Sequence, residues 1–101
     1  SETNFRKQHK LPKDKPIIAL LPGSRAQEVK KMLDVMVATA KQFPDHCFVV
    51  AAAPHLNDSL FEGLPVYVVR NDTYTLLAHA TAALVTSGTA TLWAWGAARG
   101  P

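Results

Sequence analysis

Two short turns rich in glycine and hydroxyl side chains are the parts of this sequence best suited to bind an anion. The first is Pro22-Gly23-Ser24-Arg25, and the second is Thr86-Ser87-Gly88-Thr89. Each turn follows an apolar run and precedes a segment that begins like a helix. Helix N-termini present free backbone N–H groups, and small residues let a ligand come close to the backbone. The chemistry that both turns predict is phosphate binding, although neither fits a Walker loop or a G-x-G-x-x-G fingerprint.

The first turn has two interpretations. Ser24 and Gln27 have the spacing of a capping box, which closes a helix N-terminus without any ligand. Arg25 is a cation in the first helical turn, where it opposes the helix dipole unless a negative group offsets its charge. That group is either Glu28, three residues further on, or an external phosphate. We favour phosphate, because its oxygens match the fork of the guanidinium group.

The second turn is open to the same pair of interpretations. Its three hydroxyl residues, Thr86, Ser87 and Thr89, can cap a final helix, and Gly88 can supply a left-handed turn. No acidic residue follows between positions 90 and 93, so nothing in the sequence neutralises that expected helix N-terminus.

Other residues that often carry chemistry offer less here. His55 follows an apolar run and is a candidate acid or base, although loop histidines are more often simply solvated. His46 is expected at the opposite end of the sheet, His79 late in a helix, Asp72 as a helix cap and Cys47 in the core. No carboxylate pair or metal-ligand cluster has a suitable spacing. We therefore expect no catalytic residue, metal site or cofactor in this chain.

The elements that must position the two turns alternate along the chain. Short apolar runs predict strands, and apolar residues at i, i+3 and i+4 predict helices. The strands are expected at Ile17–Leu21, Phe48–Ala52, Val66–Val69 and Ala82–Thr86, and the helices at 3–10, from 24 to Phe43, at 56–62, at 73–80 and after Gly88. This order predicts an α/β fold with a Rossmann-like parallel sheet of about four strands, in the order 3-2-1-4, and helices on both faces. Both turns then meet at the switch point between strands one and four.

Composition and charge exclude several classes of protein. A chain of 101 residues is one domain at most, and its 48% hydrophobic content is too high for a disordered chain. The net charge of +3 lies entirely in residues 1–15, which we expect to be a linker or short helix leading into residues 16–101. A neutral body argues against nucleic-acid binding. One cysteine excludes an internal disulfide, no apolar run is long enough to span a membrane, and a cytoplasmic location is expected.

The two turns and their surroundings resemble a known family. Residues 17–28, read as IIALLPGSRAQE, closely resemble the opening of the C-terminal domain of bacterial lipid-A-disaccharide synthases. Residues 83–92, read as ALVTSGTATL, resemble the second signature of that family. The resemblance extends from about Phe5 to Leu92. The two motifs together are specific for this family, whereas either one alone would indicate only a GT-B type sugar-nucleotide domain.

The resemblance implies part of the C-terminal, nucleotide-sugar-binding domain of a GT-B glycosyltransferase. Such an enzyme transfers 2,3-diacylglucosamine from its UDP donor to 2,3-diacylglucosamine 1-phosphate in lipid A biosynthesis, without a metal. By matching positions, Gly23, Ser24 and Arg25 approach the donor diphosphate, and Arg25 offsets charge on the leaving UDP. By the same matching, Ser87, Gly88 and Thr89 would cradle phosphate from the other helix N-terminus, and Thr86 is also expected to bind substrate.

The sequence also departs from the family pattern. The family continues after Leu92 with a glutamate expected to hold the donor ribose, and this chain has Trp93 instead. The resemblance also implies an N-terminal domain that supplies the catalytic base and most of the lipid-acceptor contacts, and we expect that domain to be missing from this chain. We therefore expect a truncated piece that is inactive alone and self-associates through an uncovered edge after the fourth strand. In the full-length enzyme, contact with the inner membrane is expected to be peripheral.

Two alternatives to this family remain open from the sequence. One is another GT-B sugar-nucleotide enzyme, such as a UDP-sugar epimerase. The other is a non-enzymatic, flavodoxin-like binding module, which would need an acidic cluster at the strand ends that Asp72 alone does not provide.

Overall fold

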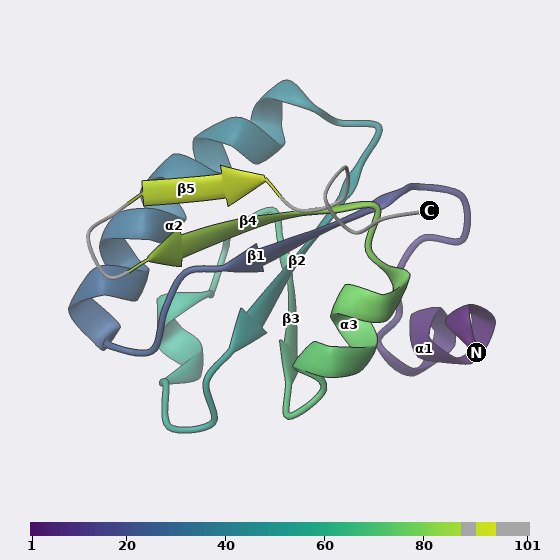
Figure 1. Cartoon of the computed structure of the whole chain (residues 1–101), viewed down its shortest axis with the longest axis horizontal. Coiled ribbons are helices and arrows are strands. Elements are labelled where there is room, and N and C mark those ends of the chain that lie inside the picture. The colour runs from purple at the N-terminus through teal and green to yellow at the C-terminus, as the bar shows by residue number, and fades with distance from the viewer. Residues whose placement is uncertain (88–90, 95–101) are drawn as a thin grey trace.

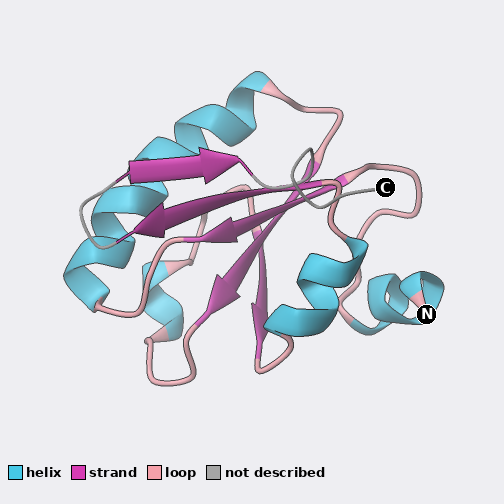
Figure 2. Ribbon diagram, in the orientation of Figure 1, coloured by secondary structure: helices cyan, strands magenta, loops and turns pink. Residues whose placement is uncertain are grey.

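The computed structural model describes residues 1–87 and 91–94, with the backbone alone for residues 86–87 and 91–94. Helices and strands alternate along most of this length, as the apolar runs predict (Figures 1 and 2). Their bounds are α1 Glu2–Gln8, β1 Ile17–Leu21, α2 Ala26–Gln42, β2 Cys47–Ala52, the 3-10 turn η1 Asp58–Leu60, β3 Tyr67–Arg70, α3 Thr73–His79, β4 Ala82–Ser87 and β5 Thr91–Ala94. Every end of the four predicted strands lies within one residue of its observed position.

The four predicted strands form a parallel sheet in the order β3-β2-β1-β4, which confirms the expected α/β, Rossmann-like fold. The parallel arrangement brings the carboxyl ends of all four strands to one edge of the sheet. Leu21, the last residue of β1, pairs with Val85 of β4. The chain therefore leaves β1 immediately beside the end of β4.

The segment after β4 forms a strand, so the helix predicted after Gly88 is wrong. β5 runs antiparallel to β4 and pairs with it from Leu84↔Ala94 to Ser87↔Thr91 (Figure 1). Without β5, β4 would end the sheet with a row of unpaired backbone groups, and threonine and tryptophan in residues 91–94 favour an extended chain. The fourth strand was expected to have an uncovered edge, and this is wrong because β4 pairs with β5, which takes its place at the end of the sheet. The expected self-association stays a prediction.

The helices cover both faces of the sheet, as expected for parallel strands that are mostly apolar. Alternate residues of β1 point to opposite faces, Ile17 and Ala19 to one and Leu20 to the other. The first face packs against α1 and α3, and the second against α2 and the segment around η1 (Figure 1). Each layer of side chains forms its own buried cluster.

α2 is amphipathic, and its buried stripe contains Val29, Met32, Leu33, Met36 and Ala40. The helix ends at Gln42, because Pro44 disfavours helical geometry in the residue before it. Phe43, the expected last residue of this helix, is its C-cap instead and is 51% exposed. Within the described part of the chain, no helix has both the length and the apolar character needed to cross a bilayer.

The helix expected over residues 56–62 is only the three-residue turn η1. Its N-cap is Asn57, whose side chain accepts a hydrogen bond from the backbone N–H of Ser59. Gly63 follows with a φ of 74°, which ends the helical geometry soon after it begins. The loop after β2 is therefore mostly irregular chain.

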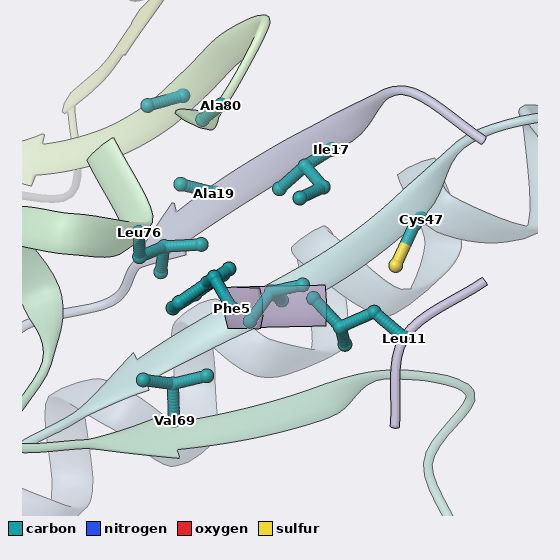
Figure 3. Close-up of a cluster of buried hydrophobic side chains, with 10 residues drawn as sticks. Phe5, Leu11, Ile17, Ala19, Cys47, Val69, Leu76 and Ala80 are labelled. Carbon is teal, nitrogen blue, oxygen red and sulfur yellow. The ribbon is translucent and has the colours of Figure 1, made fainter. Parts of the chain in front are cut away.

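Residues 1–15 pack onto the sheet as part of the same body. Phe5 of α1 and Leu11 are 3% and 7% exposed, and Figure 3 shows Phe5 among Leu11, Val69 and Leu76. Arg6 connects α1 to the chain that follows it, because its guanidinium donates hydrogen bonds to the carbonyls of Pro12 and Lys15 at 2.6 and 2.9 Å.

Candidate functional site

The candidate site lies at the edge where the parallel strands end. A depression of about 390 Å³ opens there, within the range of small-molecule sites. Most of its walls are small or apolar residues at or just beyond the ends of β1, β2 and β4, with the polar Asn71 from the loop after β3 and Thr73 from the start of α3. The lining residues are Leu21, Gly23, Ala51, Ala52, Ala53, Pro54, Asn71, Thr73 and Val85. One of the residues predicted to bind phosphate, Gly23, therefore lines a cavity.

The turn between β1 and α2 has a backbone that requires glycine. Gly23 has a φ of 105°, a value that residues other than glycine rarely adopt. Ser24 and Arg25 follow, both exposed, and α2 begins at Ala26. The exposed turn leads directly from the lining of the depression to the N-terminus of a helix of 17 residues.

The capping box predicted for Ser24 and Gln27 is wrong. The N-cap of α2 is Arg25, whose backbone is extended, and among the described side chains none makes a capping hydrogen bond there. Ser24 lies one residue too early for its hydroxyl to cap the helix. The N–H groups of the first turn of α2 therefore have no side-chain cap.

Arg25 lies beside Glu28, which the sequence offered as the alternative to an external phosphate. Its Nε lies 3.7 Å from Oε1 of Glu28, too far for a hydrogen bond, and its side chain is 86% exposed. An exposed pair at this distance adds little stability and leaves the guanidinium in contact with solvent. Arg25 is thus accessible at the helix N-terminus even with Glu28 beside it.

The second turn is only partly described. Thr86 and Ser87 are the last residues of β4, next to the end of β1, whereas Gly88 and Thr89 lie outside the described residues. The expected meeting of two helix N-termini is wrong within the described chain, because β5 replaces the second helix. The neighbouring ends of β1 and β4 are as predicted.

His55, in the loop after β2, contacts the first turn. Its Nε2 lies 2.7 Å from the backbone carbonyl of Ser24, which accepts the hydrogen bond. Arg70, at the end of β3, contacts the same loop through the carbonyl of Ala53 and the carboxylate of Asp58. Arg70 was missed because an arginine ending a strand has no distinctive spacing.

The loop between β3 and α3 forms another wall. Asn71 has a φ of 58°, a left-handed conformation that asparagine tolerates better than most residues, and this preference was the signal available in the sequence. Asp72 is the N-cap of α3 as expected, but its carboxylate does not cap the helix. Hydrogen bonds from Thr75 and His9 instead hold the pKa of Asp72 below its usual value.

The remaining candidates lie away from this edge. His46 comes just before β2, at the amino ends of the strands, and His79 lies in the last turn of α3 against the ring of Phe5. Cys47 is buried, and burial raises the pKa of its thiol. Within the described ranges, no group of three or more His, Cys, Asp or Glu residues could hold a metal ion.

The chain is similar in sequence to a known protein family. A model of the lipid-A-disaccharide synthetase family matches residues 1–98. The chain belongs to the lipid-A-disaccharide synthase family. This is the family that the two turn motifs indicated, rather than a UDP-sugar epimerase or a flavodoxin-like module.

Several members of the family are similar in sequence. The lipid-A-disaccharide synthase of Coxiella burnetii (strain Dugway 5J108-111) is 41% identical over 99 residues, which cover 91% of this chain and 26% of that protein. The synthase of Sulfurihydrogenibium sp. (strain YO3AOP1) is 33% identical over 112 residues, covering 91% and 29%. That of Neisseria meningitidis serogroup A is 41% identical over 90 residues, covering 76% and 23%. This chain therefore spans about a quarter of the length of these curated relatives.

Proposed function

We propose that residues 16–101 are part of the donor-binding domain of a lipid-A-disaccharide synthase, a glycosyltransferase of bacterial lipid A biosynthesis. The complete enzyme transfers 2,3-diacylglucosamine from UDP-2,3-diacylglucosamine to 2,3-diacylglucosamine 1-phosphate and releases UDP. Membership of the family supports this role. The geometry of the β1–α2 turn supports the assignment of the donor side to this part of the chain.

The observation that carries the proposal is the uncapped N-terminus of α2 beside the depression at the strand ends. Gly23 lines the depression, so a ligand in it lies against the backbone of the turn. The helix dipole and the free N–H groups favour an anion at this point, and the exposed guanidinium of Arg25 adds a full positive charge. A donor diphosphate on the turn would leave room in the depression for another part of the nucleotide.

The role of the turn in catalysis would be electrostatic. Cleavage of the donor leaves negative charge on UDP, and groups already oriented toward that charge lower the barrier without moving a proton. Gly23, Ser24 and Arg25 would contact the diphosphate from α2. Thr86, Ser87, Gly88 and Thr89 would contact it from the end of β4, which lies beside β1.

The acceptor half of the reaction would belong to other parts of the enzyme. The described residues of this chain show no acid–base pair at the depression, whose polar lining is Asn71 and Thr73. The base, the lipid-acceptor contacts and a peripheral contact with the cytoplasmic face of the inner membrane are assigned to the remaining three quarters of the synthase. The chain alone would bind donor nucleotide without transferring sugar.

A titration with UDP tests the proposal. In the ¹⁵N-labelled chain, millimolar UDP should cause saturable shifts of the amide signals of Gly23, Ser24 and Arg25, with smaller shifts near Asn71. Uridine, which lacks the diphosphate, serves as the control and should leave the turn unaffected. Absence of any shift at millimolar UDP would contradict the proposed function.

A further inference from the structure

Three loops at the carboxyl edge of the sheet are joined by hydrogen bonds that end on the β1–α2 turn. Arg70 donates from Nη1 to the carbonyl of Ala53 at 3.1 Å and from Nη2 to Oδ1 of Asp58 at 2.6 Å. Between these two contacts along the chain lies His55, whose Nε2 donates to the carbonyl of Ser24 at 2.7 Å. The end of β3 is thus connected through the loop after β2 to the turn after β1.

The hydrogen bond from His55 determines which way one peptide group of the turn faces. No described peptide bond is cis, so the carbonyl of Ser24 and the N–H of Arg25 point in opposite directions across a single planar unit. When His55 holds the carbonyl toward the β2 loop, the N–H of Arg25 is directed away from that loop.

Arg70 keeps the backbone around His55 in place. Its guanidinium lies 5.9 Å from the centre of the Phe61 ring, and its side chain is only 26% exposed. Packing on the ring and hydrogen bonds to both flanks of His55 restrict an otherwise irregular loop. A lysine at this position has a single ammonium group and cannot reproduce the forked contacts.

We infer that His55 is a positioning residue that orients the Ser24–Arg25 peptide for binding an anionic diphosphate, and that Arg70 acts on this peptide through His55. The inference deepens the proposed function and rests on it for the identity of the ligand. The orientation of the peptide itself is a property of the free chain. His55 needs no contact with the ligand for this role, and it donates through Nε2 whether or not Nδ1 carries a proton.

UDP affinity and the amide signals of the free chain test the inference together. H55A should weaken UDP binding about three- to tenfold, the effect of losing one ordinary hydrogen bond, and should shift the Arg25 amide and Ser24 carbonyl signals before UDP is added. H55Q, whose side-chain nitrogen can occupy the place of Nε2, should restore both. H46A is the matched control: it removes a histidine at the opposite end of the sheet, whose buried Nδ1 has no partner in the described structure, and should change neither.

A double-mutant cycle tests the part played by Arg70. R70K should weaken UDP binding in the wild-type background and have little further effect in H55A, because both changes release the same peptide. Additive losses would overturn the role of Arg70, and unchanged Arg25 and Ser24 signals in H55A would overturn that of His55. If the wild-type chain does not bind UDP at all, the proposed function fails, and the signals of the free chain still decide whether His55 orients the peptide.

Discussion

Arg25 places a cation where the dipole of α2 is already positive. The helix loses stability from this arrangement unless a negative group lies nearby, and Glu28 at 3.7 Å supplies only a weak, exposed partner. The presence of Arg25 in the first turn of this helix could be predicted from the sequence. The failure of the neighbouring capping box could not, because the backbone enters α2 one residue later than the Ser24–Gln27 spacing suggests. The helix N-terminus is consequently more open to an anion than expected.

Replacing Arg25 separates the two partners that the sequence left open. R25A should weaken UDP binding about tenfold or more, because a charge-assisted hydrogen bond contributes about 1.5–3 kcal/mol. It should change the free energy of unfolding by less than about 1 kcal/mol, since an exposed ion pair contributes little. E28Q removes the same ion pair but keeps the cation, so its UDP affinity should be unchanged or higher. Calorimetric titration and urea unfolding measure the two quantities, and equal losses of affinity in both variants would contradict the assignment.

Asp72 makes stability depend on pH at the loop beside the depression. Hydrogen bonds from Thr75 and His9 lower the pKa of Asp72 in the folded chain below its ordinary value of 3.8. The unfolded chain therefore binds this proton first as the pH falls. The stabilisation is present above about pH 4 and is lost as the pH drops through the lowered pKa.

D72N tests this pH dependence. The difference in unfolding free energy between wild type and D72N should shrink steadily as the pH falls below about 4. Acidic groups shared by both proteins cancel in the difference, and urea unfolding at several pH values measures it. A difference that stays constant down to pH 2 would show that Asp72 has no lowered pKa.

At the level of elements, the pattern of apolar residues predicted most of the fold. β1 has the predicted bounds because prolines flank a run that is buried on both faces, and α2 follows its apolar stripe. Two predictions failed for tertiary reasons. The loop after β2 makes only a short turn that Gly63 follows with positive φ, and Arg70, distant in sequence, contacts its backbone. The segment after β4 is extended because the edge of the sheet offers backbone partners that a local pattern cannot reveal.

Gly23 and Gly63 form a natural comparison for the β1–α2 turn. Both have positive φ, 105° and 74°, but only Gly23 lines the depression. Alanine at either position should lower the unfolding free energy by about 1–3 kcal/mol through backbone strain. G23A should also abolish the UDP-induced shifts of the turn, whereas G63A, where a methyl group meets no atom within 4 Å, should keep them. Thermal unfolding and the NMR titration provide the readouts, and equal UDP binding in both variants would argue against a diphosphate on this turn.

At the level of the whole molecule, the basic residues 1–15 are packed onto the sheet, although their charge suggested a segment separate from the folded body. The sequence showed that its charge is separate from the neutral body, and the strand order followed from the alternation of elements. The docking of α1 was not visible, because a seven-residue helix with one buried aromatic residue has too short an apolar pattern. The contacts of Phe5, Arg6 and Leu11 join this segment to the sheet.

The contribution of α1 to the folded unit can be measured with two aromatic residues of opposite exposure. F5A removes a ring that is 3% exposed, and a buried phenylalanine typically contributes about 3–5 kcal/mol through lost burial and the cavity left behind. Y74A removes a ring of similar size that is 90% exposed on α3 and should change the unfolding free energy by less than about 0.5 kcal/mol. Urea unfolding gives both values, and hydrogen exchange should show faster exchange across residues 2–11 in F5A. If F5A were as mild as Y74A, residues 1–15 would be a linker, and the folded unit would begin at β1.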